Sequence, residues 1–161
     1  MAAVRLSSHF TLAEMIASQT ATRLSINNQP DAEGVDALSS LCQRVLEPVR
    51  VYYGVPFSPS SGYRSKELND ILGGSKDSQH CKCEAADFSI PGIANIDVAE
   101  WMRDNVEFDQ LILEYYDHGN PCSGWVHVSF VSSPGIDQRS EALTFDGIIY
   151  HPGLPKDEQS L

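Results

Sequence analysis

Four side chains in this sequence could together carry out hydrolytic chemistry: the imidazoles of His80 and His127 and the carboxylates of Asp87 and Glu114. Two imidazoles and one carboxylate suit a catalytic zinc ion, which keeps a fourth position open for water. The metal activates water and polarises a carbonyl group, and a carboxylate that is not a ligand then accepts a proton. We therefore predict His80, Asp87 and His127 as ligands and Glu114 as the general base.

The segments that would carry three of these residues alternate between apolar and polar side chains, as strands do. The segments and their ionisable residues are 84–90 with Asp87, 108–116 with Glu114, and 124–131 with His127. Because side chains alternate between the faces of a strand, these three residues can meet on one side of a sheet. The same alternation puts Tyr115 on the opposite, apolar face. His80 lies in the loop before the first strand, from which it can reach the polar face.

Each of these residues, taken alone, also has an ordinary structural explanation. A single histidine such as His127 on a strand is more often a hydrogen-bonded structural residue than a metal ligand. Asp87 and Glu114 could be solvent-facing acids, and Arg64 could be a surface charge. The conjunction of three polar groups on one inferred face, beside a glycine-rich loop, is what favours a site.

The four cysteines offer a competing thiolate site, formed by Cys81, Cys83, Cys122 and Cys42. Zinc sites built from cysteine usually contain two C-x-x-C pairs, whereas this chain has a single C-x-C and two isolated cysteines. A C-x-C spacing is too tight to fit a tetrahedral site well. We therefore prefer the interpretation that the thiols are free and partly buried.

The order of the remaining elements indicates the fold class. Helices are expected over 9–18, 31–54, 65–74 and 95–105, and a last strand or hairpin over 142–153. A loop is expected over 20–31, and an edge strand or extended loop over 55–65. Pro48 predicts a kink or break near Glu47 in the longest helix. Helices followed by strands, with one helix between them, predict an α+β fold in which N-terminal helices pack on a mostly antiparallel sheet.

Composition excludes several classes of function. The chain has 161 residues, of which 42% are hydrophobic, and this suits one domain with a core. Its formal net charge of −11 argues against binding to nucleic acid or to anionic lipid. The sequence shows no signal peptide and no apolar run of about 20 residues. We therefore expect a soluble, monomeric protein made in the cytoplasm, without membrane insertion.

Several motifs occur in an order that resembles a known family. They are "SGYRS" (61–65), Ser78-x-His80, "AADF" (85–88), "FDQLILE" (108–114) and "WVHVSF" (125–130). Together they closely resemble the zinc D-alanyl-D-alanine carboxypeptidases, which are related in fold to the hedgehog signalling domain, and especially the small phage and prophage branch. The resemblance implies one zinc metallopeptidase domain over 1–161. Its catalytic core would lie at about 56–150 and its polar tail at about 154–161.

The resemblance implies the same three zinc ligands and adds contacts to a substrate. Arg64 would face a peptide carbonyl or a terminal carboxylate, because a guanidinium stays charged and donates in a fixed fork. Ser78 would hydrogen-bond the substrate or the loop, and Gln110 and Trp125 are expected to contact the substrate. The implied substrate is a peptidoglycan stem peptide or cross-link that contains D-amino acids. An endolysin-like carboxypeptidase or endopeptidase would reach it in the periplasm through a holin or a virion.

The sequence departs from the family pattern at two positions. Cys83 stands where relatives have glycine, so a positive φ there would strain the backbone, and the thiol could compete as a ligand. Gly124 stands where many relatives place the catalytic glutamate. Glu114 is therefore the preferred base, whereas Asp109 falls on the opposite face and Asp117 lies past the strand end. The missing glutamate also favours an alternative function, a non-catalytic zinc-binding domain of a virion or a wall-binding protein.

Overall fold

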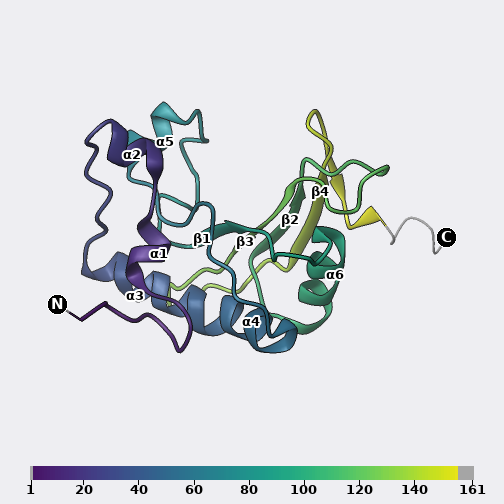
Figure 1. The fold of residues 1–161 in the computed structure, drawn as a ribbon, viewed down its shortest axis with the longest axis horizontal. Helices are drawn as coiled ribbons and strands as arrows, with labels where there is room; N and C mark the ends of the chain where they lie inside the picture. Colours follow the sequence, from purple (N-terminus) through teal and green to yellow (C-terminus); the bar gives the residue numbers. More distant parts are fainter. Residues whose placement is uncertain (1, 156–161) are drawn as a thin grey trace.

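The computed structural model describes residues 2–155 and has the predicted α+β fold (Figure 1). Helices dominate the N-terminal half, and the described residues form one five-stranded sheet further along the chain. Among these residues, no helix has both the length and the apolar character required to cross a bilayer. Most of the predicted polar tail, 154–161, lies outside the described residues.

Side-chain caps fix the short helices at the start of the chain. Thr11 caps α1 (Leu12–Ile16), and Glu14 closes the predicted capping box. Helix α2 (Gln19–Arg23) lies in a segment that was expected to be a loop, and Ser18 caps it by accepting a backbone hydrogen bond. The prediction of a loop was wrong because a five-residue helix is too short to show an apolar period.

The longest helical segment is interrupted where the sequence predicts. Helix α3 (Ala32–Leu41) continues into a π-helical turn, η1 (Cys42–Leu46), and then into α4 (Glu47–Tyr53). Pro48 has no backbone N–H to donate, and the wider turn directly before it accommodates this break in the ladder. The segment ends at Gly54, which has a left-handed φ of +67°.

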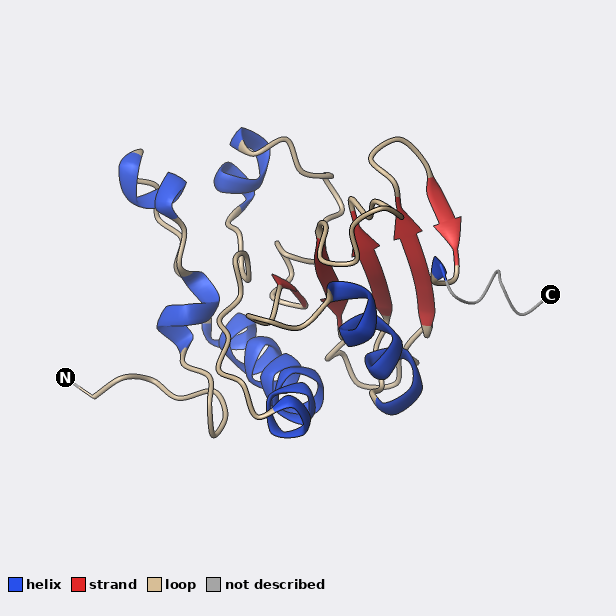
Figure 2. Cartoon of the chain, turned by 45° about the vertical axis from the view of Figure 1, so that its right-hand side comes forward, coloured by secondary structure: helices blue, strands red, loops and turns tan. Residues whose placement is uncertain are grey.

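The sheet, whose strands are drawn in red in Figure 2, has the strand order β1-β3-β2-β4-β5. Its strands are β1 (Ala85–Phe88), β2 (Gln110–Glu114), β3 (Trp125–Ser129), β4 (Glu141–Phe145) and β5 (Tyr150–Pro152). Neighbouring strands are antiparallel except for β2 and β4, which are parallel. Strands β4 and β5 form the predicted C-terminal hairpin. Helix α5 (Lys66–Ile71) precedes β1, whereas α6 (Asn95–Asn105) follows β1 and packs on β2 and β3.

One face of the sheet is covered and the other is open. The covered face carries the apolar side chains that the alternation predicts, namely Ala86, Phe88, Leu111, Leu113, Val126 and Val128, all fully buried. They form one core with buried residues of α3, η1, α4 and α6. Asp87, Glu114 and His127 lie on the opposite face, which confirms the prediction for these three residues.

The alternation fails at Tyr115, the first residue after β2. Its backbone is left-handed, with φ +51°. The two-residue repeat ends there, so the ring lies on the open side, stacked on Trp125 with centroids 5.0 Å apart. The expectation that Tyr115 faces the core was therefore wrong, and its side chain is half exposed.

Candidate active site

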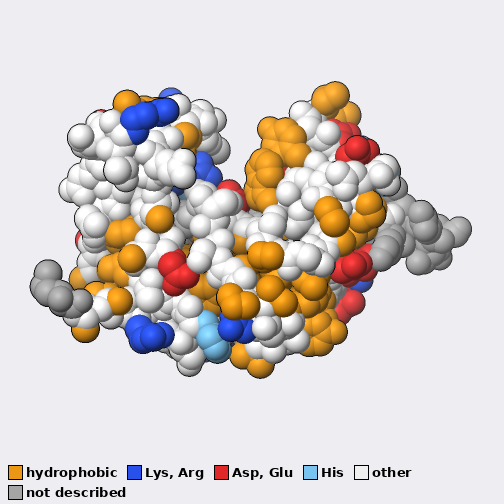
Figure 3. All heavy atoms as spheres, in the orientation of Figure 1, with side chains coloured by type: hydrophobic (Ala, Val, Ile, Leu, Met, Phe, Trp, Pro, Cys, Tyr) orange, Lys and Arg blue, Asp and Glu red, His pale blue; other side chains and the backbone are white. Residues whose placement is uncertain are grey.

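The open face of the sheet is the floor of a cavity of about 900 Å³. Figure 3 shows the molecule hollowed between the part that carries α2 and α5 and the part that carries the β4–β5 hairpin. His80, Asp87, Glu114 and His127 all line this cavity. The four residues predicted to carry the chemistry are thus brought to one place.

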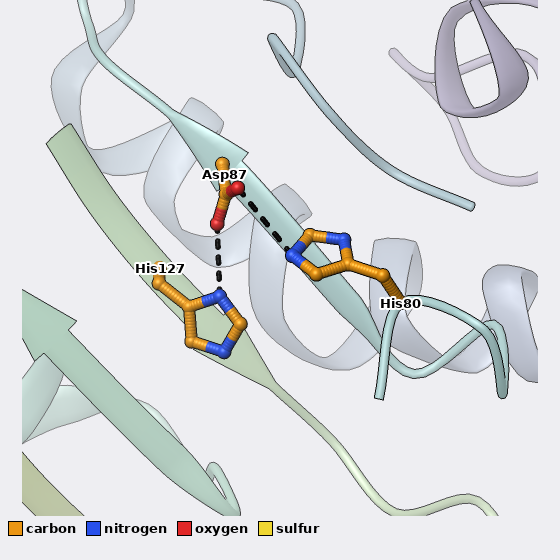
Figure 4. Close-up of side chains that lie close together, drawn as sticks. All are labelled: His80, Asp87 and His127. Carbon is orange, nitrogen blue, oxygen red and sulfur yellow. Dashed lines mark hydrogen bonds and ion pairs between the residues drawn. The ribbon is translucent and has the colours of Figure 1, made fainter. Parts of the chain in front are cut away.

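Three of these residues converge closely (Figure 4). Asp87 of β1 and His127 of β3 are directly opposed in the antiparallel register, so both side chains leave the sheet at the same point. Nδ1 of His127 lies 2.8 Å from one carboxylate oxygen of Asp87, and Nε2 of His80 lies 3.4 Å from the other. One carboxylate therefore stands between two imidazoles.

The loop before β1 holds His80 rigidly, and the imidazole is almost fully buried. Nδ1 of its ring lies 2.7 Å from the carbonyl oxygen of Gly62. Because a carbonyl can only accept, Nδ1 carries a proton, and Nε2 is the ring nitrogen that faces Asp87. The hydroxyl of Ser78 accepts a hydrogen bond from the His80 backbone N–H, so this predicted substrate contact also supports the loop.

The electrostatics of Asp87 favour its ionised form. Burial alone would raise the pKa of the Asp87 carboxyl, but hydrogen bonds from His127 and His80 outweigh burial and hold the pKa well below its usual range. The guanidinium of Arg64, 3.7 Å from Asp87, adds a positive charge on the same side. Asp87 is therefore a carboxylate at neutral pH, as a metal ligand must be.

The donor set fits a zinc ion. Bonds of about 2.0–2.2 Å to nitrogen and oxygen place tetrahedral ligand atoms about 3.4 Å apart. The candidate ligand atoms of His80, Asp87 and His127 all lie within 4.8 Å of one another. An ionised carboxylate and an imidazole whose tautomer is already fixed complete a preorganised site. These three residues are therefore the group that could hold the metal.

The cysteines do not form a competing site in the described part of the chain. Cys42 is buried in the helical core and Cys122 is exposed in the turn before β3. Burial raises the pKa of the Cys83 thiol to about 12, and nearby carboxylates add to this effect. The only group of three candidate ligands found among residues 2–155 is the His–Asp–His group, so the thiolate alternative receives no support.

Cys83 occupies a glycine-like conformation, as the family pattern predicts. Its φ is +61°, a value that strains an L-residue. The side chain points toward α3, where a Cβ placed on Gly34 would come within 2.7 Å of the sulfur. Cys83 thus fills a gap beside Gly34, with its thiol packed in the protein interior.

Gly124 cannot be replaced by a glutamate in this backbone. It has a φ of +67°, and a Cβ there would overlap the carbonyl oxygen of Glu114 on the neighbouring strand. Glu114 itself lines the cavity, and none of the hydrogen bonds or ion pairs found among residues 2–155 holds its carboxylate. Burial raises the pKa of Glu114; His127 opposes this effect and the charge of Asp87 adds to it. Glu114 is therefore an unengaged carboxylate beside the ligands.

The weaker candidates for the base are engaged elsewhere. Asp109 lies just before β2 and lines the cavity, so its assignment to the opposite face was wrong. Its buried carboxylate accepts hydrogen bonds from Gln79, at 3.1 Å, and from the guanidinium of Arg139, at 2.7 Å. Asp117 is exposed and accepts from the backbone N–H of Gly119 in its own turn. The sequence did not predict the contacts of Asp109 with Gln79 and Arg139, because they join three loops and involve no periodic element.

The remaining predicted substrate contacts all line the cavity. Arg64 donates to the Ser61 hydroxyl and to Asn69, both at 3.1 Å, so its guanidinium is fixed in place. Gln110 donates to Glu141 of the adjacent strand. Trp125 stands at the other end of β2 from Gln110, next to Glu114 in the strand register.

An α+β fold that presents two imidazoles and one carboxylate to an open cavity is typical of zinc-dependent hydrolases. The sequence profile of the peptidase M15 family matches residues 8–129, which include all three candidate ligands. The chain belongs to the peptidase M15 family and is, by that membership, a zinc metallopeptidase. No curated protein matches the chain in sequence.

Proposed function

We propose that this protein hydrolyses peptide bonds in peptidoglycan, in stem peptides or cross-links that contain D-amino acids. The observation that carries the proposal is the position of Glu114, an unengaged carboxylate in the same cavity as the His80–Asp87–His127 group. A purely structural metal site does not need such a carboxylate, whereas hydrolysis needs a proton acceptor.

Each residue then has a defined task. His80, Asp87 and His127 would hold zinc, which when bound supplies a Lewis acid that polarises the scissile carbonyl and activates water. Glu114 accepts the proton of the attacking water and returns it to the leaving amine. Its raised pKa suits this exchange, because a base that must also act as an acid works best near the operating pH.

Arg64 would bind and orient the substrate. Its contacts with Ser61 and Asn69 leave further N–H groups of the guanidinium available. From this fixed position it can donate to a peptide carbonyl oxygen and stabilise negative charge that develops there. Gln110, at the start of β2, and Trp125, paired with Glu114 on β3, extend the binding surface along the sheet.

The resemblance to the phage and prophage branch supports an endolysin-like role. In that role a holin or a virion would deliver the protein to the periplasm, and the monomer would act there on the wall. The alternative of a non-catalytic zinc-binding domain rested on the missing glutamate at position 124. The backbone around Gly124 leaves no room for a side chain, so a catalytic base must come from another position, and the unengaged Glu114 supports the catalytic proposal.

The proposal is tested by mass spectrometry of muropeptides digested with the protein. We expect new peptide products in the presence of zinc and none after treatment with a chelator, with recovery when zinc is restored. The masses of the products identify the bond and separate carboxypeptidase from endopeptidase action. A metal-loaded protein that leaves every muropeptide intact would overturn the proposal.

A further inference from the structure

Four aromatic side chains form a continuous wall at the β4–β5 end of the cavity, which we call the aromatic platform: Tyr115, Trp125, Phe145 and Tyr150. The ring of Tyr115 stacks on Trp125 at 5.0 Å and meets Phe145 edge-on at 5.1 Å. Phe145 in turn stacks on Tyr150 at 4.4 Å. Tyr115 and Tyr150 remain 51% and 53% exposed, so a large apolar surface faces the cavity.

The backbone around the platform is specialised to build it. Tyr115 adopts a left-handed φ of +51°, which is costly for a bulky residue and is found mostly where function requires it. Gly124 faces it without a Cβ, since a side chain there would collide with the carbonyl groups of Glu114 and Tyr115. Gly147, in the β4–β5 turn, lies over the Tyr115 ring, where an added Cβ would sit 3.5 Å away.

Three cations line the cavity among the described residues, Arg64, Lys82 and Arg139, and none of them lies on a strand that carries the platform. Lys82 precedes β1, whose first residue, Ala85, pairs with Ser129 at the opposite end of β3 from Trp125. Arg139 is held by Asp109 at the start of β2, about 20 Å along the strand from Tyr115. Arg64 is held beside Asp87 on β1, which is the neighbour of β3 but lies across the sheet from Phe145 of β4 and Tyr150 of β5. Glu114, directly before Tyr115, is an acid that lines the cavity beside the platform. The platform therefore disfavours an anionic ligand and suits a neutral one.

A neutral ligand for stacked aromatic rings needs a flat apolar face, and the tyrosine hydroxyls can hydrogen-bond polar groups at its edge. A pyranose ring has this character, with C–H groups on its face and hydroxyls around its rim. Nucleic acid bases also stack on aromatic rings, but the net charge of −11 opposes binding of a phosphate backbone. A sugar ring is thus the ligand that fits both the shape and the charge.

We propose that the aromatic platform is a carbohydrate subsite that takes an uncharged N-acetylhexosamine ring of the wall glycan. The attached peptide would then lie across Glu114 and the candidate metal ligands in the same cavity. This inference rests on the proposed function and adds the glycan to its substrate. The rival occupant is an apolar side chain of the peptide, which the experiments below separate from a sugar.

Binding is measured first, independently of catalysis, with a soluble tetramer of N-acetylglucosamine. In a Trp101→Phe background Trp125 is the remaining tryptophan, so its fluorescence reports on the platform. We expect a saturable change in fluorescence as the tetramer is added. The affinity for the tetramer should fall about tenfold in Tyr150→Leu, which keeps apolar volume but loses the flat ring. Tyr52→Leu is the matched control, because Tyr52 is exposed and lies outside the cavity. Its ring stacks on Trp101, so this control keeps both tryptophans and its binding of the tetramer is measured by calorimetry.

Turnover is then compared on two substrates, a disaccharide-bearing muropeptide and the same peptide after an amidase has removed its sugars. Tyr150→Leu should lower kcat/KM about tenfold, through KM, for the sugar-bearing substrate alone. An equal loss on both substrates, or no saturable binding of the tetramer by the parent protein, would overturn the inference. If the parent protein binds the tetramer but cleaves neither substrate, the proposed peptidase function fails and the carbohydrate subsite stands.

Discussion

The imidazole of His80 donates a 2.7 Å hydrogen bond from Nδ1 to the carbonyl oxygen of Gly62, and this bond decides which ring nitrogen faces Asp87. Gly62 is buried and packs so tightly on the backbone of Met15 that a Cβ would overlap the Met15 carbonyl oxygen. A glycine more than a dozen residues before the candidate ligand therefore determines its orientation.

Replacing Gly62 with alanine should weaken zinc binding. The added methyl group forces the Gly62 carbonyl away from His80, and loss of such a supporting hydrogen bond typically costs 10- to 100-fold in metal affinity. Calorimetric titration with zinc measures the effect. Gly119→Ala is the matched control, since a Cβ at this exposed position meets only ordinary contacts, at 3.5 Å from Asp117. An unchanged affinity in Gly62→Ala would show that the carbonyl does not position the ring.

Glu114→Gln should retain zinc and lose most of its turnover. Glutamine keeps the shape of the side chain but cannot accept a proton, and loss of a general base costs roughly 10²- to 10⁴-fold in rate. Metal content by mass spectrometry and peptide release by chromatography give the two readouts. The exposed Glu107→Gln removes the same charge outside the cavity and should be fully active. Full activity in Glu114→Gln would remove this residue from the mechanism.

His127→Ala should lose both the metal and the activity. The substitution removes one of three ligands and leaves Asp87 without its 2.8 Å partner. Zinc stoichiometry after dialysis is expected to fall from one toward zero, and chelator should have no further effect. His118→Ala, an exposed histidine outside the cavity lining, should bind zinc normally. Retention of one tightly bound zinc by His127→Ala would exclude His127 as a ligand.

The cysteine thiols should contribute no band to the absorption spectrum of the bound metal. A cobalt-substituted protein is expected to show the visible bands of nitrogen and oxygen ligation, without the intense near-ultraviolet band of a thiolate. Cys83→Ala should leave this spectrum and the metal stoichiometry unchanged, because the thiol packs beside Gly34. A thiolate band that disappears in Cys83→Ala would restore the cysteine site.

The ionisation of Asp109 should make the free energy of unfolding depend on pH. Burial alone would raise the pKa of Asp109, but hydrogen bonds from Arg139 and Gln79 outweigh it and lower the pKa below its usual value. Because the pKa of Asp109 is lower in the folded state, its carboxylate stabilises that state at pH values above the unfolded-state pKa of about 4. This contribution is lost as the pH falls through the folded-state pKa. Asp109→Asn should therefore cost about 1–3 kcal/mol in unfolding free energy at neutral pH and progressively less in acid.

Urea unfolding of both proteins at pH 7, 5, 4 and 3 tests this dependence. The difference in unfolding free energy should be constant between pH 7 and 5 and should shrink below pH 4. Asp137→Asn, at an exposed position in the loop that also carries Arg139, is the control and should show no such trend. A difference that is independent of pH would mean that Asp109 acts only by its shape.

Strand periodicity was sufficient to place Asp87, Glu114 and His127 on one face, because a two-residue repeat with one buried face leaves little choice of orientation. His80 lies in a loop, where no period applies, so the sequence could place it only within reach of this face. The parallel pairing of β2 with β4 and the contact of Asp109 with Arg139 join segments about 30 residues apart. Local patterns carry no information about such pairings.

Tyr115 shows where a local pattern gives a wrong prediction. The repeat that correctly placed Glu114 gave the wrong face for the next residue, because the chain turns left-handed there. The signal that could have revealed the turn is Gly124, which faces Glu114 across the hairpin and tolerates no side chain. Recognising it requires the strand register, which only the structure supplies.

The direct opposition of Asp87 and His127 has a consequence for how the protein reaches its folded state. The two residues are 40 positions apart, and they meet only when β1 pairs with β3 in the native register. A slip of one residue would turn Asp87 to the other side of the sheet and separate the pair. A metal ion that uses both ligands would bind only molecules with the native register and would stabilise them by mass action. Metal supply would then influence the yield of folded protein.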